Sequence, residues 1–314
     1  MHTLETTTKA PQKTTRVLLF YKYVKISDTA ALKLEQEALC ASLQLVGRII
    51  VSQEGMNGTV EGSAAACEAY MKAARAHPLF STMGFKQSDG TGTTFPKLSV
   101  KIRSEIVSAN FGKKDIDPNV VTGKYLTAEE LHEWIRSDRE FYIVDMRNDY
   151  EHRVGFFKNS VLPPLKNFRD LPKVLPKLRH LKKKTVVTVC TGGVRCEKAS
   201  GFLVTHGFKD VYQLKDGIHT YMEKYPNEDF VGKLYVFDGR VTMGFNTDAP
   251  EHLVVSQCDK CGETSDHYVD CAYIHCKNIR HFICCESCLD DQGRGYCDEV
   301  CQEKDSVLQN MTAV

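Results

Sequence analysis

The residues with the clearest chemical potential form a short loop, Cys190–Cys196, with the sequence CTGGVRC. The loop follows a β-branched run, Thr185–Val189, which is typical of a buried parallel strand, and a segment of helical character begins at Glu197. Two glycines allow such a loop to curl with its N–H groups inward, and a helix N-terminus behind it attracts negative charge. These features would lower the pKa of Cys190, and the thiolate is the nucleophilic form of cysteine.

We therefore predict Cys190 as the catalytic residue, with the loop and the Arg195 guanidinium stabilising an anion beside it. The predicted anion-binding residues are Thr191, Gly192, Gly193, Val194 and Arg195. Cys196 either resolves a persulfide or disulfide on Cys190 or simply packs in the following helix. The alternative for Cys190 is an inert buried thiol at the end of a strand.

A second polar pair, Asp145 and Arg147, follows a short strand predicted at Phe141–Val144. Polar side chains at the carboxyl ends of strands often line the site of an α/β protein, so both residues are candidate accessory residues. They suit a structural ion pair equally well. Just upstream, Thr127 and Glu130 have the spacing of a capping box and predict the start of a helix.

Most of the remaining cysteines lie near the C-terminus, where nine of the thirteen fall between residues 258 and 301. The first 15 residues have no apolar signal-peptide core, and no apolar stretch is long enough to span a membrane. We therefore expect a cytoplasmic protein with no membrane partner and with mostly reduced cysteines.

The C-terminal cysteines are arranged in pairs. Two C-x2-C pairs suit tetrahedral zinc and are the candidate metal ligands: Cys258, Cys261, Cys285 and Cys288. The wider pairs at 271/276 and 297/301 are less specific, and nearby histidines are candidate substitutes. A structural zinc would stabilise a segment with little core, whereas packing cysteines and disulfides are the alternatives.

The net charge of +1 is unevenly distributed. Residues 166–198 contain ten Lys and Arg against two acidic residues, a net charge of +8, which leaves −7 for the rest of the chain. Contacts from such a segment to phosphates would give RNA affinity without sequence specificity. The candidate RNA-binding residues are Lys166, Arg169, Lys182, Lys183, Lys184 and Lys198. The alternative is a solvated surface.

Residues 16–108 have a pattern that predicts the order β-α-β-β-α-β, as in a ferredoxin-like domain. Strands are expected at 16–26, 48–52, 59–62 and 95–107, with helices from Asp28 to about Gly47 and over 64–76. The segment Gly55–Gly58 is either an RNA or substrate loop or a tight strand connection. Gly90–Gly92 is not a dinucleotide fingerprint, so we predict no nucleotide cofactor.

The loop C-x-x-G-x-R resembles the active loop of the rhodanese (sulfurtransferase) fold. Asp145–Glu151 resembles the D-x-R-x-x-x-E element of that fold, and Gly207–Ile218 resembles its last strand and glycine-containing turn. The stretch Gly155–Ser160 departs from the rhodanese pattern because it lacks the usual histidine.

The longer string Cys190–Ser200, with Gln53–Gly58 and the Cys-rich tail, resembles the bacterial tRNA uridine hydroxylase family over residues 16–301. The resemblance implies an α/β protein with a ferredoxin-like (acylphosphatase-like) α+β N-terminal domain, a rhodanese-like parallel α/β domain and a small Cys-rich C-terminal region. The expected divisions are a flexible N-terminus at 1–15, the first domain at 16–108, a linker at 109–124, the rhodanese domain at 125–228 and the tail at 229–314.

The same resemblance implies an oxidoreductase that hydroxylates the wobble uridine 34 of tRNA to 5-hydroxyuridine. Molecular oxygen would be the co-substrate and the anticodon stem-loop the partner, and Cys190 matches the persulfide-type cysteine of the family. Two chemical routes are open: the Cys190 thiolate adds to C6 of uracil, or its sulfur carries oxygen. The loop alone favours a sulfurtransferase with a persulfide on Cys190, and a third interpretation is a non-enzymatic RNA-binding module.

Overall fold

The computed structural model describes residues 15–112, 115–277 and 281–312, and the chain forms two compact units, Met1–Ser108 and Ala109–Val314. The N-terminus expected to be flexible lies, except for Thr15, outside the described residues. Within the described ranges, none of the helices combines the length and the apolar composition needed to cross a bilayer.

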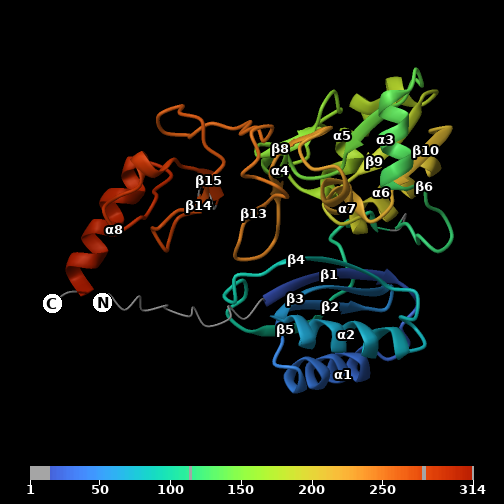
Figure 1. The fold of residues 1–314 in the computed structure, drawn as a ribbon, viewed down its shortest axis with the longest axis horizontal. Helices are drawn as coiled ribbons and strands as arrows, with labels where there is room; N and C mark the ends of the chain where they lie inside the picture. The colour runs from blue at the N-terminus through green and yellow to red at the C-terminus, as the bar shows by residue number, and fades with distance from the viewer. Residues whose placement is uncertain (1–14, 113–114, 278–280, 313–314) are drawn as a thin grey trace, which may run out of the picture. The chain divides into compact units, whose positions relative to one another are not determined.

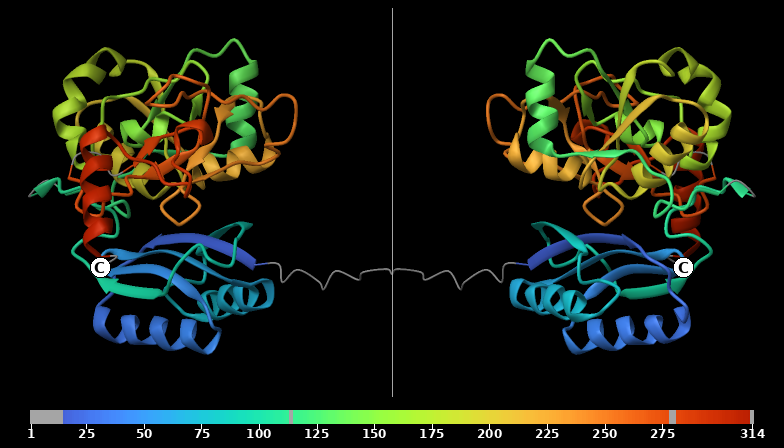
Figure 2. Two further views of the ribbon diagram at one scale, coloured as in Figure 1. Left: turned by 90° about the vertical axis from the view of Figure 1, so that its left-hand side faces the viewer. Right: turned by 90° about the vertical axis from the view of Figure 1, so that its right-hand side faces the viewer.

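The N-terminal unit is a single sheet covered on one face by two helices (Figure 1). Its elements are β1 (Thr15–Tyr23), α1 (Thr29–Ser42), β2 (Val46–Ser52), β3 (Gly55–Ser63), α2 (Ala64–Ala76), β4 (Gly84–Asp89) and β5 (Leu98–Ile102). The strand order is β4-β1-β3-β2-β5, with β5 parallel to β2. Apolar side chains such as Phe20, Ile49 and Tyr70 form a core between sheet and helices. Figure 2 shows α1 and α2 on the same face in two further views.

Several local predictions for this unit were wrong, although the ferredoxin-like class is confirmed. Strand β4 was missed because its sequence, GFKQSD, has one apolar side chain. The segment predicted as the last strand is β5, an addition beside β2. Helix α1 begins after the Asp28 cap as predicted, but it ends at Ser42, and Gly47 lies inside β2.

Gly55–Gly58 is neither a loop nor a tight connection, because it forms the first half of strand β3. Asn57 is paired with Ile50 of β2 and with Tyr21 of β1. A Cβ on Gly58 would lie 2.6 Å from the Phe20 ring, so this glycine serves close packing and not a turn.

The C-terminal unit contains a parallel sheet in the order β6-β10-β9-β7. The elements of this part are β6 (Lys124–Leu126), α3 (Ala128–Arg136), β7 (Tyr142–Asp145), α4 (Asp149–His152), β8 (Gly155–Phe157), η2 (Phe168–Asp170), α5 (Leu171–Leu178), η3 (Arg179–Leu181), β9 (Thr185–Val189), α6 (Val194–Thr205), β10 (Asp210–Leu214), α7 (Gly217–Lys224) and β11 (Phe230–Gly232). The predicted capping box is confirmed at Thr127 and Glu130. Strand β9 is central and buried, which places its carboxyl end inside the unit.

The tail of this unit has short elements and a small core. They are β12 (Leu234–Tyr235), β13 (Thr242–Met243), β14 (Tyr268–Asp270), β15 (His281–Ile283), η4 (Glu286–Cys288) and α8 (Glu299–Thr312). Strands β14 and β15 form an antiparallel ladder in which Val269 is paired with Phe282. The buried residues around them include several cysteines, so aliphatic packing alone does not fill this region.

Candidate active site

The Cys190 side chain lies at the carboxyl end of β9, where the chain turns directly into helix α6. Its Sγ accepts a hydrogen bond from the Gly193 N–H at 3.3 Å. Gly193 has φ +98°, a conformation that glycine adopts readily, and this conformation directs its N–H toward the sulfur. The helix starts at Val194, earlier than predicted, so Arg195 and Cys196 lie in its first turn.

The surroundings of Cys190 favour its thiolate. Complete burial raises its pKa, but a hydrogen bond from the Cys196 thiol, the Arg195 charge and nearby backbone N–H groups together lower it to about 6. Burial and the neighbouring Cys190 raise the pKa of Cys196 well above its ordinary value. Cys190 is therefore the more acidic thiol of this pair, and Cys196 is the less acidic one.

The Arg195 guanidinium is held by a buried carboxylate that is absent from the residues predicted for the site. Its Nη1 and Nη2 atoms donate to the two oxygens of Glu151 at 2.5 and 2.8 Å, and Nη2 also donates to Thr191 Oγ1 at 3.2 Å. Glu151 is fully buried on α4. The position of Glu151 in the D-x-R-x-x-x-E element could have marked it as a site residue. The spacing alone, however, does not show which arginine Glu151 contacts.

Asp145 and Arg147 form a buried ion pair with each other. Arg147 Nη2 donates to Asp145 Oδ2 at 2.7 Å and to the Gly155 carbonyl at 2.8 Å. The Arg147 side chain has no solvent exposure. The pair thus connects β7 to β8 and holds the segment that carries Glu151. This arrangement fits the structural ion pair that the sequence also suggested.

Gly217 allows the start of α7 to pack closely against the Cys190 loop. The Ile218 N–H donates to the Cys190 carbonyl at 2.9 Å, and the His219 N–H donates to the Thr191 carbonyl at 3.0 Å. Gly217 has φ +74°, and a Cβ there would lie 2.7 Å from the Cys190 carbonyl oxygen. This position therefore requires glycine both for conformation and for space.

The basic segment does not form one patch beside Cys190. Lys182, Lys183 and Lys184 precede β9, so the length of that strand, roughly 17 Å at 3.3 Å per residue, separates them from Cys190. Lys166 is nearer the site, because its Nζ lies 2.6 Å from Asp149 on α4. The lysines that are close to Cys190 in the sequence are therefore separated from it in space by the length of β9.

The basic side chains also differ in availability. Lys198 does not belong to an exposed surface: its side chain is buried and its Nζ contacts both oxygens of Asp115 at 3.0 and 3.1 Å. Lys184 is paired with Glu140 at 2.6 Å. Among the described residues, no carboxylate lies within ion-pair distance of the exposed Arg169 or Lys183.

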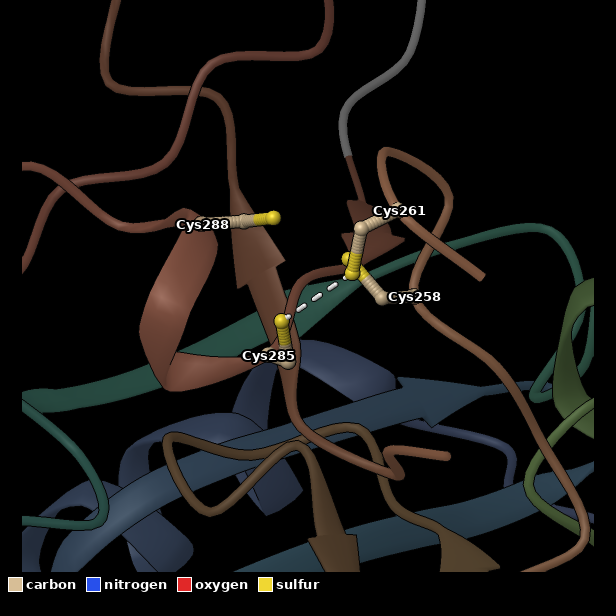
Figure 3. A group of neighbouring side chains, drawn as sticks. All are labelled: Cys258, Cys261, Cys285 and Cys288. Carbon is tan, nitrogen blue, oxygen red and sulfur yellow. Dashed lines mark hydrogen bonds between the residues drawn. The ribbon is translucent and has the colours of Figure 1, made fainter. Parts of the chain in front are cut away.

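The four predicted metal ligands converge in the tail (Figure 3). The Sγ atoms of Cys258, Cys261, Cys285 and Cys288 all lie within 4.8 Å of one another. The first pair occupies a tight turn in which the Lys260 N–H donates to Cys258 Sγ at 3.4 Å, and Gly262 completes the turn at φ +79°. Four thiols around one point form a ligand set for a single tetrahedral ion.

A second group of four cysteines was not predicted as a set. Its members are Cys271, Cys276, Cys297 and Cys301, with Sγ atoms again within 4.8 Å of one another. The two irregular spacings, x4 and x3, concealed it because neither pair alone has the common zinc spacing. Cys284 is buried beside the first cluster, and among the described residues neither cluster includes a histidine.

The first cysteine cluster is connected to α4, the helix whose Glu151 contacts Arg195. Asp259, between Cys258 and Cys261, accepts hydrogen bonds from Arg153 Nη1 and Nη2 at 3.1 and 2.5 Å. The Tyr268 hydroxyl donates to the Tyr150 carbonyl at 2.6 Å. Both contacts reach α4 or the residue after it, so the tail braces the element that carries Glu151.

The fold and the cysteine loop define a protein with a rhodanese-like domain, and residues 127–224 match the family model described as "Rhodanese-like domain". Residues 15–106 match "UPF0176 acylphosphatase like domain", and residues 231–302 match "Rhodanase C-terminal". The solved structure titled "Crystal Structure of Rhodanese-like Domain Protein from Staphylococcus aureus" covers 31% of this chain and 90% of its own, at 28% identity and a TM-score of 0.27.

Two curated relatives match nearly the whole chain. A protein of Cytophaga hutchinsonii named tRNA uridine(34) hydroxylase is 43% identical over 91% of this chain and 89% of its own length. A protein of Corynebacterium jeikeium with the same name is 40% identical over 92% of this chain and 96% of its own length. The chain belongs to the tRNA uridine(34) hydroxylase family.

The Cys190 thiolate predicts a distinct ultraviolet titration. The absorbance difference between the protein and its Cys190→Ser variant should rise as pH increases through about 6, because Cys190 is protonated below that pH and ionised above it. Cys196→Ala, which removes the thiol donor, should raise the midpoint by about 1, whereas Cys196→Ser keeps a donor and should leave it near 6. A midpoint at the ordinary value of 9.0 would contradict this assignment.

The close approach at Gly217 predicts an unequal effect of two alanine substitutions. Gly217→Ala and Gly207→Ala both place a side chain at positive φ, at a cost of about 1 kcal/mol. Only Gly217→Ala also meets backbone at 2.7 Å, whereas a Cβ on Gly207 meets the flexible end of Lys182 at 3.7 Å. Urea unfolding should show about 1–3 kcal/mol more destabilisation for Gly217→Ala, and equal losses would refute the packing argument.

Proposed function

We propose that this protein hydroxylates C5 of the wobble uridine 34 of tRNA, forming 5-hydroxyuridine, with Cys190 as the catalytic residue. The observation that carries the proposal is the position of Cys190 at a helix N-terminus, where the Gly193 N–H donates to its Sγ and its pKa is lowered, in the rhodanese-like domain of a chain that belongs to this family. Neither a packing cysteine nor a binding module requires such a thiolate.

The Cys190 thiolate acts as a nucleophile in this proposal. Its sulfur adds to C6 of uracil, the C5–C6 double bond opens, and C5 becomes electron-rich. C5 then takes one atom of molecular oxygen. Loss of the C5 proton and departure of the Cys190 sulfur restore the double bond.

The balance of the reaction requires a reductant as well as oxygen. Molecular oxygen accepts four electrons, two from the uridine C5–H bond and two from a thiol reductant that becomes a disulfide. One oxygen atom ends in the C5 hydroxyl group, and the other leaves as water with the two thiol protons. Because Cys190 is fully buried in this structure, its loop has to open before a base reaches the sulfur.

The tRNA partner binds through its anticodon stem-loop, in which uridine 34 is unpaired and accessible. Cations of the basic segment that are at least partly exposed contact the phosphates. Arg169 and Lys166 serve the side near α4, and Lys182, Lys183 and Lys184 serve the opposite end of β9. Lys198 has no part in this contact, because it is buried against Asp115.

The first cysteine cluster binds structural zinc. Its four thiolates close a tetrahedral ligand set, which is the form of a structural rather than a catalytic zinc site. When the zinc site is formed, the contact between Asp259 and Arg153 also stabilises the end of α4.

Loss of the Cys190 thiol should abolish product formation. We expect Cys190→Ser protein, incubated with tRNA, oxygen and a thiol reductant, to lower the yield of 5-hydroxyuridine at least 100-fold, as measured by nucleoside mass spectrometry. Cys67→Ser is the matched control: Cys67 is also fully buried, but its pKa is raised by burial to about 11, so its replacement should leave the yield unchanged.

Two outcomes would contradict the proposal. An unchanged yield with Cys190→Ser would exclude Cys190 catalysis. Persulfide formation on Cys190 and thiocyanate release from thiosulfate and cyanide, without any 5-hydroxyuridine, would instead identify a sulfurtransferase, the activity that the loop by itself favours.

Phosphate binding by these cations predicts a change in salt dependence. Replacing Lys166 and Arg169 together by alanine should weaken tRNA binding and reduce the slope of log affinity against log salt by about 0.7–0.9 for each phosphate that is no longer neutralised. The triple alanine variant of Lys182, Lys183 and Lys184 should act likewise. Lys72→Ala, at an exposed position on α2, is the control and should leave the slope unchanged. Unchanged slopes in both basic variants would refute the proposed surface.

A further inference from the structure

We infer that Cys271, Cys276, Cys297 and Cys301 form a second zinc site, interleaved along the chain with the first. The existence of this site is independent of the proposed function, whereas the interleaving rests on the zinc proposed at the first cluster. The second site takes the two cysteine pairs whose spacing is least regular, and only the fold brings them together.

The sulfur positions suit one shared ion. The Sγ atoms of Cys276 and Cys297 are 3.5 Å apart, and those of Cys297 and Cys301 are 3.6 Å apart. Four sulfurs at about 2.3 Å from a tetrahedral zinc are about 3.8 Å from one another. A disulfide requires about 2.0 Å and would use the sulfurs in pairs. In an iron–sulfur cluster the four thiols are divided among two or four iron atoms, so the four sulfurs as a set stand farther apart than four sulfurs that share one ion.

Backbone contacts hold each of the two pairs in place. The Ala272 N–H donates to the Gly295 carbonyl at 2.8 Å, which brings the first pair beside the second. The Cys276 N–H closes a turn onto the Tyr273 carbonyl at 2.9 Å. The Cys301 N–H donates to Asp298 Oδ1 at 2.7 Å in the first turn of α8. The sulfurs are thus positioned by turns and a helix start and do not meet by chance.

The hairpin of β14 and β15 separates the two sites and explains their interleaving. Cys271 follows the end of β14, and Cys285 follows β15 by two residues. Because the two strands are antiparallel, their carboxyl ends lie at opposite ends of the ladder. Along the chain, successive cysteine pairs therefore belong alternately to the first site and to the second.

This arrangement makes the tail one metal-dependent unit. Each site joins two segments that enclose a ligand pair of the other site, and each site lies at its own end of the ladder, so each ion holds one end of the tail. The ladder is three residues long. Cysteines make up most of the buried cluster around Phe282, and a small cluster around Tyr268 and Ile283 is the other packing of the ladder, so the hydrophobic core of the tail is small.

Metal analysis of the full chain tests the inference. Elemental mass spectrometry of the purified protein should give two zinc ions per chain. Cys276→Ser with Cys297→Ser should retain one, and Cys261→Ser with Cys288→Ser should also retain one. Cys284→Ser removes a cysteine that lies outside both clusters, so it is the matched control and should retain two.

The outcomes separate the two sites. One zinc in the native protein that persists in the Cys276/Cys297 variant would overturn the second site and leave the first. One zinc that disappears only in that variant would support the second site and refute the first. Iron in place of zinc, or disulfides among the four cysteines of the second site under non-reducing mass spectrometry, would also overturn the second zinc site.

A measurement on the native chain tests the inference even if the variants do not fold. Protein produced with Co²⁺ in place of zinc should show the visible absorption bands of tetrahedral cobalt thiolate at the intensity of two ions per chain. Octahedral bands, or the intensity of one ion that the Cys276/Cys297 variant also retains, would contradict a second four-thiolate site.

Discussion

The ion pair between Arg195 and Glu151 joins the two segments on which the candidate active site depends. One partner lies in the first turn of α6 beside Cys190, and the other lies on the short helix α4. Both are buried, so removing one would leave an uncompensated charge, at a cost of about 3–5 kcal/mol. The same pair orients the positive charge that favours the Cys190 thiolate, and the site therefore requires α4 to be in place.

Other contacts of the C-terminal unit support this constraint. The buried Asp145–Arg147 pair anchors the chain before and after α4, and Gly217 brings α7 against the cysteine loop. From the tail, Asp259 contacts Arg153 just beyond α4. The cysteine clusters thus have a consequence beyond local stability, because the turn that holds Cys258 and Cys261 is also the turn that braces α4.

Local sequence patterns predicted much of this architecture. The run Thr185–Val189, the glycines after Cys190, the Thr127 capping box and the Asp28 cap each depend on neighbouring residues, and each was found at its predicted place. Strand β4 was missed because Phe85 is its one apolar side chain. Gly58 was misassigned to a turn because a small residue required by the Phe20 ring looks the same in sequence as one required by a turn.

The sequence by itself determined the candidate catalytic cysteine, its loop and the first set of four thiols, because the loop is one short segment and the four thiols form two pairs of regular C-x2-C spacing. Only the tertiary structure decided which carboxylate holds Arg195, that Lys198 is buried, and that Lys182–Lys184 lie at the far end of β9 from Cys190. It also decided that four cysteines of irregular spacing share one centre. The physical reason is that burial, ion pairing and ligand sets depend on distances between segments, which the folding of the parallel sheet and the tail hairpin establishes.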